Sequence, residues 1–156
     1  MTYTQQEKEY YMSLALEQAR LAFDKGEVPV GCVIVWEGRV VAKAHNTRET
    51  EKNALHHAEI KAIDTACREL GGWRLHKGDM FVTLEPCIMC AGAIASSRIR
   101  KVYWGAADLR AGGFGGITDI RDLPITHKPM SEGGVLEAEA SGLLKEFFAQ
   151  LRKKLR

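Results

Sequence analysis

The sequence predicts an α/β layer fold, in which helices pack on a sheet, within a single domain that spans residues 1–156. The first observation behind this prediction is the order of the expected elements: helix, two strands, helix, strand, helix, strand, loop and helix. The second is size and composition, because 156 residues with 46% hydrophobic content can bury one substantial core. No internal repeat, linker or low-complexity segment divides the chain.

The first elements are a helix and a β-hairpin. Thr4 and Glu7 have the spacing of a capping box, in which each side chain binds the other residue's backbone at a helix start. Two β-rich runs follow at 32–36 and 39–44, and the short turn around Gly38 predicts that they form a hairpin. The helix itself is predicted by apolar residues at helical spacing, namely Met12, Ala15, Leu16, Ala19 and Phe23.

A second helix and a strand–helix pair occupy the middle of the chain. A polar loop, 45–53, leads to a helix that should end at Gly71, because glycine readily adopts the left-handed conformation of a helix end. Residues 80–84 then form a strand, and a helix over 87–97 follows with Pro86 in its first turn. The periodic apolar positions of the earlier helix are Ile60, Ile63, Ala66 and Leu70.

The last third of the chain contains a strand, a glycine-rich segment and a final helix. The strand is expected at 102–106, and the segment 110–116 should be either mobile or tightly turned. The helix is predicted by Leu143, Leu144, Phe147, Phe148 and Leu151. Its basic end suits the helix dipole and would also suit contact with phosphates. The basic residues are Arg152, Lys153, Lys154 and Arg156.

The most informative pattern is a split motif, H-x-E at 57–59 followed by P-C-x-x-C at 86–90. Together the two halves are typical of zinc-dependent nucleobase deaminases. His57, Cys87 and Cys90 supply three zinc ligands, and a catalytic zinc site leaves its fourth position for water. The H-x-E spacing selects His57 over its neighbour His56. Two cysteines at i and i+3 share one helix face, and a helix start favours the thiolate that binds zinc.

Glu59 is the expected proton carrier. Residues two apart do not share a helix face, so His57 and Glu59 meet at one site only if they lie at a helix start. Glu59 would take a proton from water and pass it to the ring and then to the leaving amine. A redox pair of cysteines would explain neither Pro86 nor the H-x-E. A zinc-stabilised binding module without activity is disfavoured by Glu59 and by the lack of an obvious fourth ligand.

Charge, cysteine content and the absence of targeting features indicate where the protein acts and which partners it can have. The net charge is only +2, so the chain is not a polycation. Cys32 and Cys67 stand alone in apolar patterns, which predicts that Cys32 is a core residue and argues against a disulfide framework, so we expect a reducing cytoplasm. The N-terminus lacks the features of a signal peptide, and no apolar run approaches the ~18 residues of a membrane span.

From about Tyr11 to Lys153 the chain resembles the bacterial tRNA-specific adenosine deaminases of the cytidine-deaminase-like superfamily. This resemblance implies a three-layer α/β/α fold with a central five-stranded mixed sheet, one zinc ion per chain and a homodimer. It also implies conversion of adenosine to inosine at the wobble position of a tRNA anticodon. The stretches that carry it are 26–31, 44–46, 57–60, 72–75 and 83–94.

The same resemblance assigns substrate-binding residues. Asn46 matches an asparagine that hydrogen-bonds the flipped base, Val28 and Ala58 match pocket-lining positions, and Asp108 matches an aspartate beside the nucleic-acid-binding loop. The sequence departs from the family pattern mainly in 109–127, where RNA contact is expected. The alternative is therefore a deaminase of a free nucleobase or nucleoside, of guanine, cytosine or adenosine type, with the same zinc chemistry.

Overall fold

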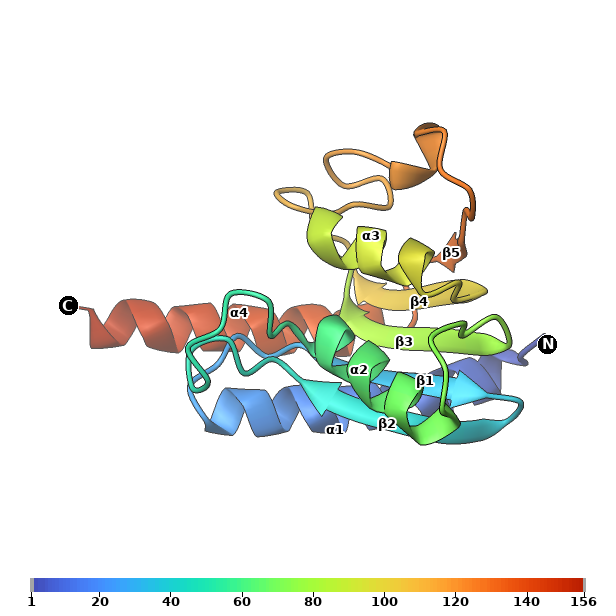
Figure 1. The fold of residues 1–156 in the computed structure, drawn as a ribbon. Helices are drawn as coiled ribbons and strands as arrows, with labels where there is room; N and C mark the ends of the chain where they lie inside the picture. The colour runs from blue at the N-terminus through green and yellow to red at the C-terminus, as the bar shows by residue number, and fades with distance from the viewer. Residues whose placement is uncertain (1, 156) are drawn as a thin grey trace.

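The computed structural model describes residues 2–155 and confirms the α/β/α architecture (Figure 1). One five-stranded sheet has the strand order β2-β1-β3-β4-β5. β1 is antiparallel to both β2 and β3, whereas β3, β4 and β5 run parallel, so the sheet is mixed. The strands are β1 (Gly31–Trp36), β2 (Arg39–His45), β3 (Gly78–Leu84), β4 (Lys101–Ala106) and β5 (Met130–Glu132).

Two helices cover each face of the sheet. α1 and α4 lie on one face, and α2 and α3 lie on the other, as Figure 1 shows. A short 3₁₀ turn, η1, follows α3 and β4 in the chain and packs near α3. The helical elements are α1 (Gln5–Asp24), α2 (Ala58–Leu70), α3 (Ile88–Ser96), η1 (Ile120–Asp122) and α4 (Glu137–Lys154).

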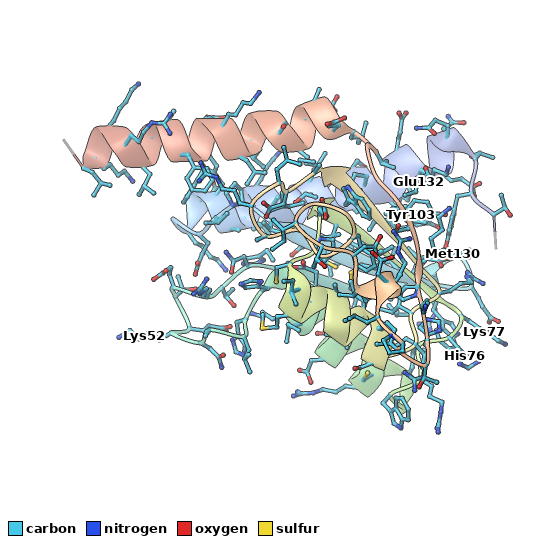
Figure 2. The ribbon with its side chains drawn as sticks, turned by 90° about the horizontal axis from the view of Figure 1, so that it is seen from above. Lys52, His76, Lys77, Tyr103, Met130 and Glu132 are labelled. Carbon is cyan, nitrogen blue, oxygen red and sulfur yellow. The ribbon has the colours of Figure 1, made fainter. Side chains whose placement is uncertain are left out.

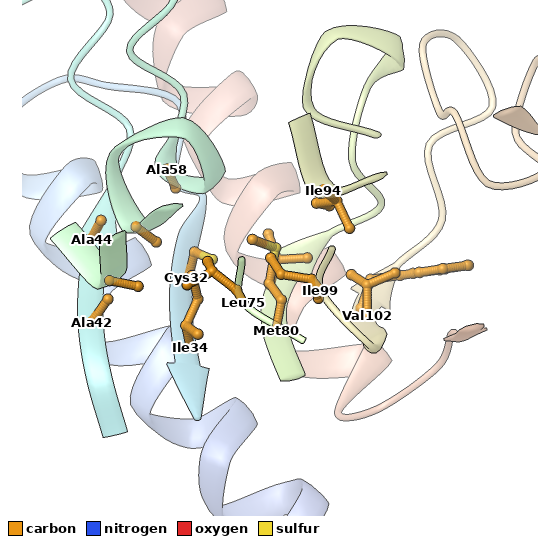
Figure 3. Packing of buried hydrophobic residues seen from close by; sticks show 14 of the residues in the cluster. Cys32, Ile34, Ala42, Ala44, Ala58, Leu75, Met80, Ile94, Ile99 and Val102 are labelled. Carbon is orange, nitrogen blue, oxygen red and sulfur yellow. The ribbon is translucent and has the colours of Figure 1, made fainter. Parts of the chain in front are cut away.

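Alternation along the central strands divides the core between these two layers. Cys32 and Ile34 of β1 belong to the cluster that packs under α2 and α3, together with Met80 of β3 (Figure 3). Val33 and Val35 point to the opposite face and join the cluster under α1. Successive side chains of a strand point to opposite faces, so a strand buried on both sides must be apolar throughout. The prediction of Cys32 as a core residue is confirmed.

The predicted helix boundaries have a local cause. Thr4 Oγ1 accepts a hydrogen bond from Glu7 N at 3.1 Å, and Glu7 Oε1 accepts one from Thr4 N at 2.9 Å, which completes the capping box of α1. At the end of α2, Gly71 adopts the left-handed conformation with φ of 71°. Both signals are readable from the sequence because caps depend on a few neighbouring residues.

Only part of the apolar stripe of α4 is buried. Leu143 and Phe147 are buried, and the Phe147 ring packs against Phe23 of α1, but Phe148 and Leu151 remain 41% and 40% exposed. The reason is that the C-terminal end of α4 projects past the rest of the molecule, as Figures 1 and 2 both show. No helix of residues 2–155 has the length and apolar character that crossing a membrane requires.

Ion pairs stabilise the edge of the sheet formed by β5. Tyr103 of β4 pairs with Glu132 of β5, and the two side chains lie side by side in Figure 2. Lys8 and Lys101 bind the Glu132 carboxylate at 2.9 and 3.3 Å. The tip of the loop between β2 and α2, marked by Lys52, lies at the opposite side of the molecule in that view.

Candidate active site

A cavity of about 230 Å³ opens where the start of α2 meets the end of β3. Two loops form its walls: residues 46–57, between β2 and α2, and residues 107–119, after β4. The cavity brings together most of the residues that the sequence singled out, which are Val28, Asn46, His57, Ala58, Glu59, Cys87 and Asp108.

Three side chains on this cavity are placed to hold a metal ion. His57 Nδ1 lies 3.6 Å from the Sγ atoms of both Cys87 and Cys90. A tetrahedral zinc with Zn–S of about 2.3 Å and Zn–N of about 2.0 Å separates nitrogen from sulfur by about 3.6 Å. The donor set and its spacing therefore fit zinc. Within residues 2–155 the cluster contains no fourth protein ligand, as a catalytic site requires.

Two of these ligands come from helix N-caps. His57 precedes α2 and Cys87 precedes α3, both have extended backbone, and neither side chain caps its own helix. Cys90 follows within the first turn of α3. Pro86 therefore lies one residue before the cap, and its predicted place in the first helical turn was wrong. The Pro86 carbonyl accepts a hydrogen bond from Gly113 N at 2.7 Å, which ties Pro86 to the loop 107–119.

Hydrogen bonds within the ligand set shift its proton affinities. A hydrogen bond from the Cys90 thiol, aided by His57, lowers the pKa of Cys87 to about 4. The same bond and burial raise the pKa of Cys90. Its hydrogen bond to Cys87 raises the pKa of His57. The site thus stabilises one thiolate even with protein groups alone, and thiolate is the form that binds metal.

Glu59 lies beside the ligands and inside the protein. It is the second residue of α2 and only 4% exposed. Burial raises the pKa of Glu59 to about 7. A carboxyl group with that pKa can both accept and release a proton near neutral pH, as acid–base catalysis requires. The predicted meeting of His57 and Glu59 at a helix start is confirmed in its geometry.

Asn46 faces the cavity with its amide already oriented. Its Nδ2 donates to the Val28 carbonyl at 3.2 Å, and its Oδ1 accepts from Arg48 N at 3.1 Å. The residue is 8% exposed. Each of these contacts leaves the amide a further donor or acceptor direction, since Asn has two N–H donors and two lone pairs.

A buried glutamate holds the loop 46–57. Glu27 is 0% exposed, and its carboxylate accepts from Glu49 N at 3.0 Å and from Thr50 N and Oγ1, both at 2.7 Å. Burial opposes the charge of Glu27, but these hydrogen bonds outweigh it and lower its pKa. Sequence reasoning missed Glu27. The available signal was an acidic residue directly before the apolar run 28–35.

A second cluster holds the same loop from outside. The exposed Glu51 carboxylate receives hydrogen bonds from Thr47, from His56 Nδ1 at 2.7 Å and from Lys61 Nζ at 2.9 Å. His56 thus has a structural partner outside the metal cluster, which agrees with its exclusion as a ligand.

The segment 110–116 lies in a tightly turned loop, residues 107–119, as one of the two predicted alternatives has it. It wraps around another buried glutamate, Glu85, which sequence reasoning also missed. Asp108 caps the first turn of this loop, because its Oδ1 accepts from Arg110 N at 3.0 Å and Ala111 N at 3.1 Å.

The basic residues of α4 lie at a distance from the chemistry. A groove of about 680 Å³ along α4 shares Val28, Leu84, Asp108 and Ala111 with the cavity, so the two adjoin each other. Arg152 lines that groove, whereas Lys153 and Lys154 are exposed on the last turn. Arg156, the fourth candidate for phosphate contact, lies outside the described residues.

Comparison with known proteins agrees with this geometry. The family model of the cytidine and deoxycytidylate deaminase zinc-binding region matches residues 5–106. A tRNA-specific adenosine deaminase of Bacillus subtilis is 47% identical over 147 residues, covering 94% of this chain and 91% of its own. One of Aquifex aeolicus is 48% identical over 149 residues, with 95% and 98% covered.

A solved structure adds the fold. It comes from a study of A-to-I editing by tRNA:A34 deaminases, is 41% identical and has a TM-score of 0.82. The match covers 86% of this chain and 99% of that one. The sequence, the ligand geometry and the fold agree along almost the whole chain, and this protein belongs to the tRNA-specific adenosine deaminase family of zinc-dependent deaminases.

Proposed function

We propose that this protein hydrolytically deaminates adenosine to inosine at the wobble position of a tRNA anticodon. The observation that carries the chemistry is the position of Glu59, buried in the same cavity as a three-ligand zinc site. The nearly full-length relatives that are named tRNA-specific adenosine deaminases support the substrate.

The reaction needs a water molecule activated and a proton carried. His57, Cys87 and Cys90 would hold the zinc ion, and its charge would lower the pKa of the attacking water toward ~7. Glu59 accepts one proton from water and delivers it to the purine ring nitrogen, then carries the second proton of that water to the departing amine. A C–O bond forms at the ring carbon while its C–N bond breaks, so one water is consumed and ammonia leaves.

The cavity residues orient the base. We assign Asn46 the role of hydrogen-bonding the purine edge with its free amide directions. Val28 and Ala58 provide apolar contact, and Asp108 shapes the wall that joins the cavity to the groove along α4. A base from a folded anticodon loop must be extruded to reach such a cavity.

The end of α4 offers phosphate contacts. Arg152, Lys153 and Lys154 are exposed on its last turn, beside the groove that adjoins the cavity. Arg156 follows them in the sequence and is assigned the same role. Phosphate contacts fix the position of a nucleic acid without reading its sequence.

We also propose that the protein acts as a homodimer in the cytoplasm. Apolar side chains are exposed beside α3, with Ile88 at 50% and Leu123 at 55%, and they offer a surface for a second copy. All four cysteines are free, which suits a reducing compartment. Sedimentation of the wild type and of Leu123→Asp tests the dimer, since a monomeric wild type contradicts it.

The substrate is tested by comparing RNA with free compounds. One preparation is incubated with an anticodon stem-loop and with free adenosine, guanine and cytosine, and inosine and ammonia are scored. We expect turnover of the stem-loop. Efficient turnover of a free base with none on the stem-loop would favour the alternative, a free-base or nucleoside deaminase.

Salt dependence provides an independent test of the RNA surface. Each neutralised phosphate releases counterions, so stem-loop binding should weaken as salt rises. Replacing Arg152, Lys153, Lys154 and Arg156 with glutamine should flatten that slope and leave the zinc content unchanged. An unchanged slope would remove these residues from the substrate surface.

A further inference from the structure

We propose that Glu85 is a positioning residue that sets the cavity wall formed by residues 108–116. The inference rests on the proposed function only in taking this cavity as the substrate site. Glu85 stands at the end of β3, two residues before the zinc ligand Cys87, and is 3% exposed. It carries a charge-bearing group into the interior without taking part in the ligand set.

Glu85 lines the cavity, but the hydrogen bonds of its carboxylate are made with the loop. Oε1 accepts from Asp108 N at 3.0 Å, and Oε2 accepts from Phe114 N at 3.1 Å and from Gly116 N at 2.9 Å. Each of these donors is a backbone N–H, so both carboxylate oxygens are engaged by the same loop. The carboxylate of Glu85 is therefore engaged with the loop backbone, whereas Glu59 lies beside the zinc ligands.

The loop sequence is shaped to receive this carboxylate. A Cβ on Gly112 would collide with the Glu85 carboxylate, and one on Gly116 would collide with the Asp108 carbonyl oxygen and come within 2.9 Å of Glu85 Oε2. Only glycine allows the backbone to approach the carboxylate this closely. Phe114 fixes the same segment from its other side, because its ring is 4% exposed and stacks on Trp104 with centroids 5.8 Å apart.

The consequence reaches the substrate through Asp108 and Ala111. Both residues line the cavity and both also line the groove along α4. Asp108 N is held by Glu85, and Asp108 Oδ1 in turn holds Ala111 N. Glu85 therefore positions the substrate-facing wall through Asp108 and Ala111. The ligands His57 and Cys87 are positioned separately, by the starts of α2 and α3.

The test uses Glu85→Gln with Asp79→Asn as a matched control. The amide replaces one acceptor oxygen with a donor, which then faces backbone N–H groups and repels them. We expect the KM for a stem-loop to rise about tenfold or more, equivalent to about 1.4 kcal/mol, with a smaller change in kcat and zinc retained. Asp79 lies on β3, which Glu85 directly follows, and is 1% exposed, but it binds Tyr3 and Arg100 and does not line the cavity.

Hydrogen exchange supplies a readout that does not depend on turnover. In Glu85→Gln, peptides covering 108–116 should exchange faster than in the wild type, while those covering 78–84 should not change. If Glu85→Gln does not fold, Gly112→Ala tests the same contact from the loop side, because its Cβ would meet the Glu85 carboxylate first, and it should give the same pattern.

Three results would overturn the proposal. They are an unchanged KM with unchanged exchange of 108–116, an equal rise in KM for Asp79→Asn, and loss of zinc from folded Glu85→Gln. A wild type inactive on RNA would contradict the proposed function instead, and the exchange experiment would still decide the role of Glu85.

Discussion

Each of the two loops that wall the cavity is held by a buried glutamate, but the loops differ in glycine content and in the other contacts that hold them. Each loop encloses a buried glutamate that accepts three hydrogen bonds: Glu27 for 46–57 and Glu85 for 107–119. The first loop contains no glycine and adds a polar side-chain cluster around Glu51. The second contains four glycines, at 112, 113, 115 and 116, and closes through close backbone approach.

This difference teaches where each wall is vulnerable. A loop held by several side chains loses one contact with each substitution and should weaken gradually. A loop whose glycines let the backbone approach a buried carboxylate closely should lose its structure when a single Cβ is added, because neither the backbone nor the carboxylate has room to move aside. The following predictions test that contrast, from the largest expected effect to the smallest.

The largest effects should come from the two residues between the walls that carry the chemistry. Glu59→Ala, in the first turn of α2, should retain zinc and lose roughly 10²–10⁴-fold in kcat, the usual contribution of an acid–base group. Cys87→Ala, at the N-cap of α3, should lose zinc as well as activity. Metal analysis and single-turnover deamination measure both, and zinc loss from Glu59→Ala would show that its assigned role is wrong.

Asn46→Ala should weaken the first wall where it meets the substrate. An unpaired buried polar group costs about 1–3 kcal/mol, which corresponds to a fall in kcat/KM of roughly 5- to 160-fold. Zinc content should not change. Asn53→Ala is the matched control, because Asn53 lies in the same loop and binds only Leu55 N, outside the cavity. Equal losses in both variants would contradict a substrate role for Asn46.

Gly112→Ala should destabilise the second wall. Overpacking costs about 1–3 kcal/mol, and for a chain of this size each kcal/mol shifts Tm by about 2–4 °C. Gly92→Ala is the control, since a Cβ there meets nothing within 4 Å and Gly92 lies inside α3. That variant should gain about 0.5–1 kcal/mol. Thermal unfolding compares them, and an unaltered Tm for Gly112→Ala would remove the contrast between the walls.

The smallest effect should come from Glu51→Gln in the first wall. Hydrogen bonds from Thr47, Lys61 and His56 lower the pKa of Glu51 to about 2. Because folding lowers the pKa of Glu51, its ionised carboxylate stabilises the loop fully above about pH 4.5, and this contribution is lost as the pH falls toward 2. Because Glu51 is exposed, water screens it. Exchange of 47–56 at pH 7 should rise slightly, with Lys52→Gln as control, and collapse of activity would contradict gradual weakening.

The sequence predicted the features that depend on neighbouring residues. The capping box of α1, the glycine end of α2 and the three ligands were all visible because each is set by a short, regular spacing. The residues alone did not predict β5, since Met130–Glu132 is three residues long and pairs only with β4. Its existence followed from the family resemblance instead.

The two anchoring glutamates could not be placed from sequence for a different reason. Glu85 acts on residues 23 to 31 positions away, and Glu27 on residues 22 and 23 positions away. Such contacts depend on the complete fold. The only local sign was an acidic residue at the border of an apolar strand, which also occurs on ordinary surfaces.

His57 and Cys87 lie at the starts of two different helices, so a metal ion bound by both would cross-link the chain as well as take part in the reaction. It joins positions 30 residues apart in the chain. Closing a loop of that length in the unfolded chain removes conformational entropy worth on the order of 3–4 kcal/mol, by the same chain-entropy reasoning that applies to a disulfide. In a chain whose cysteines are all free, the ion supplies a covalent-like tie between α2 and α3 that a reducing environment cannot break.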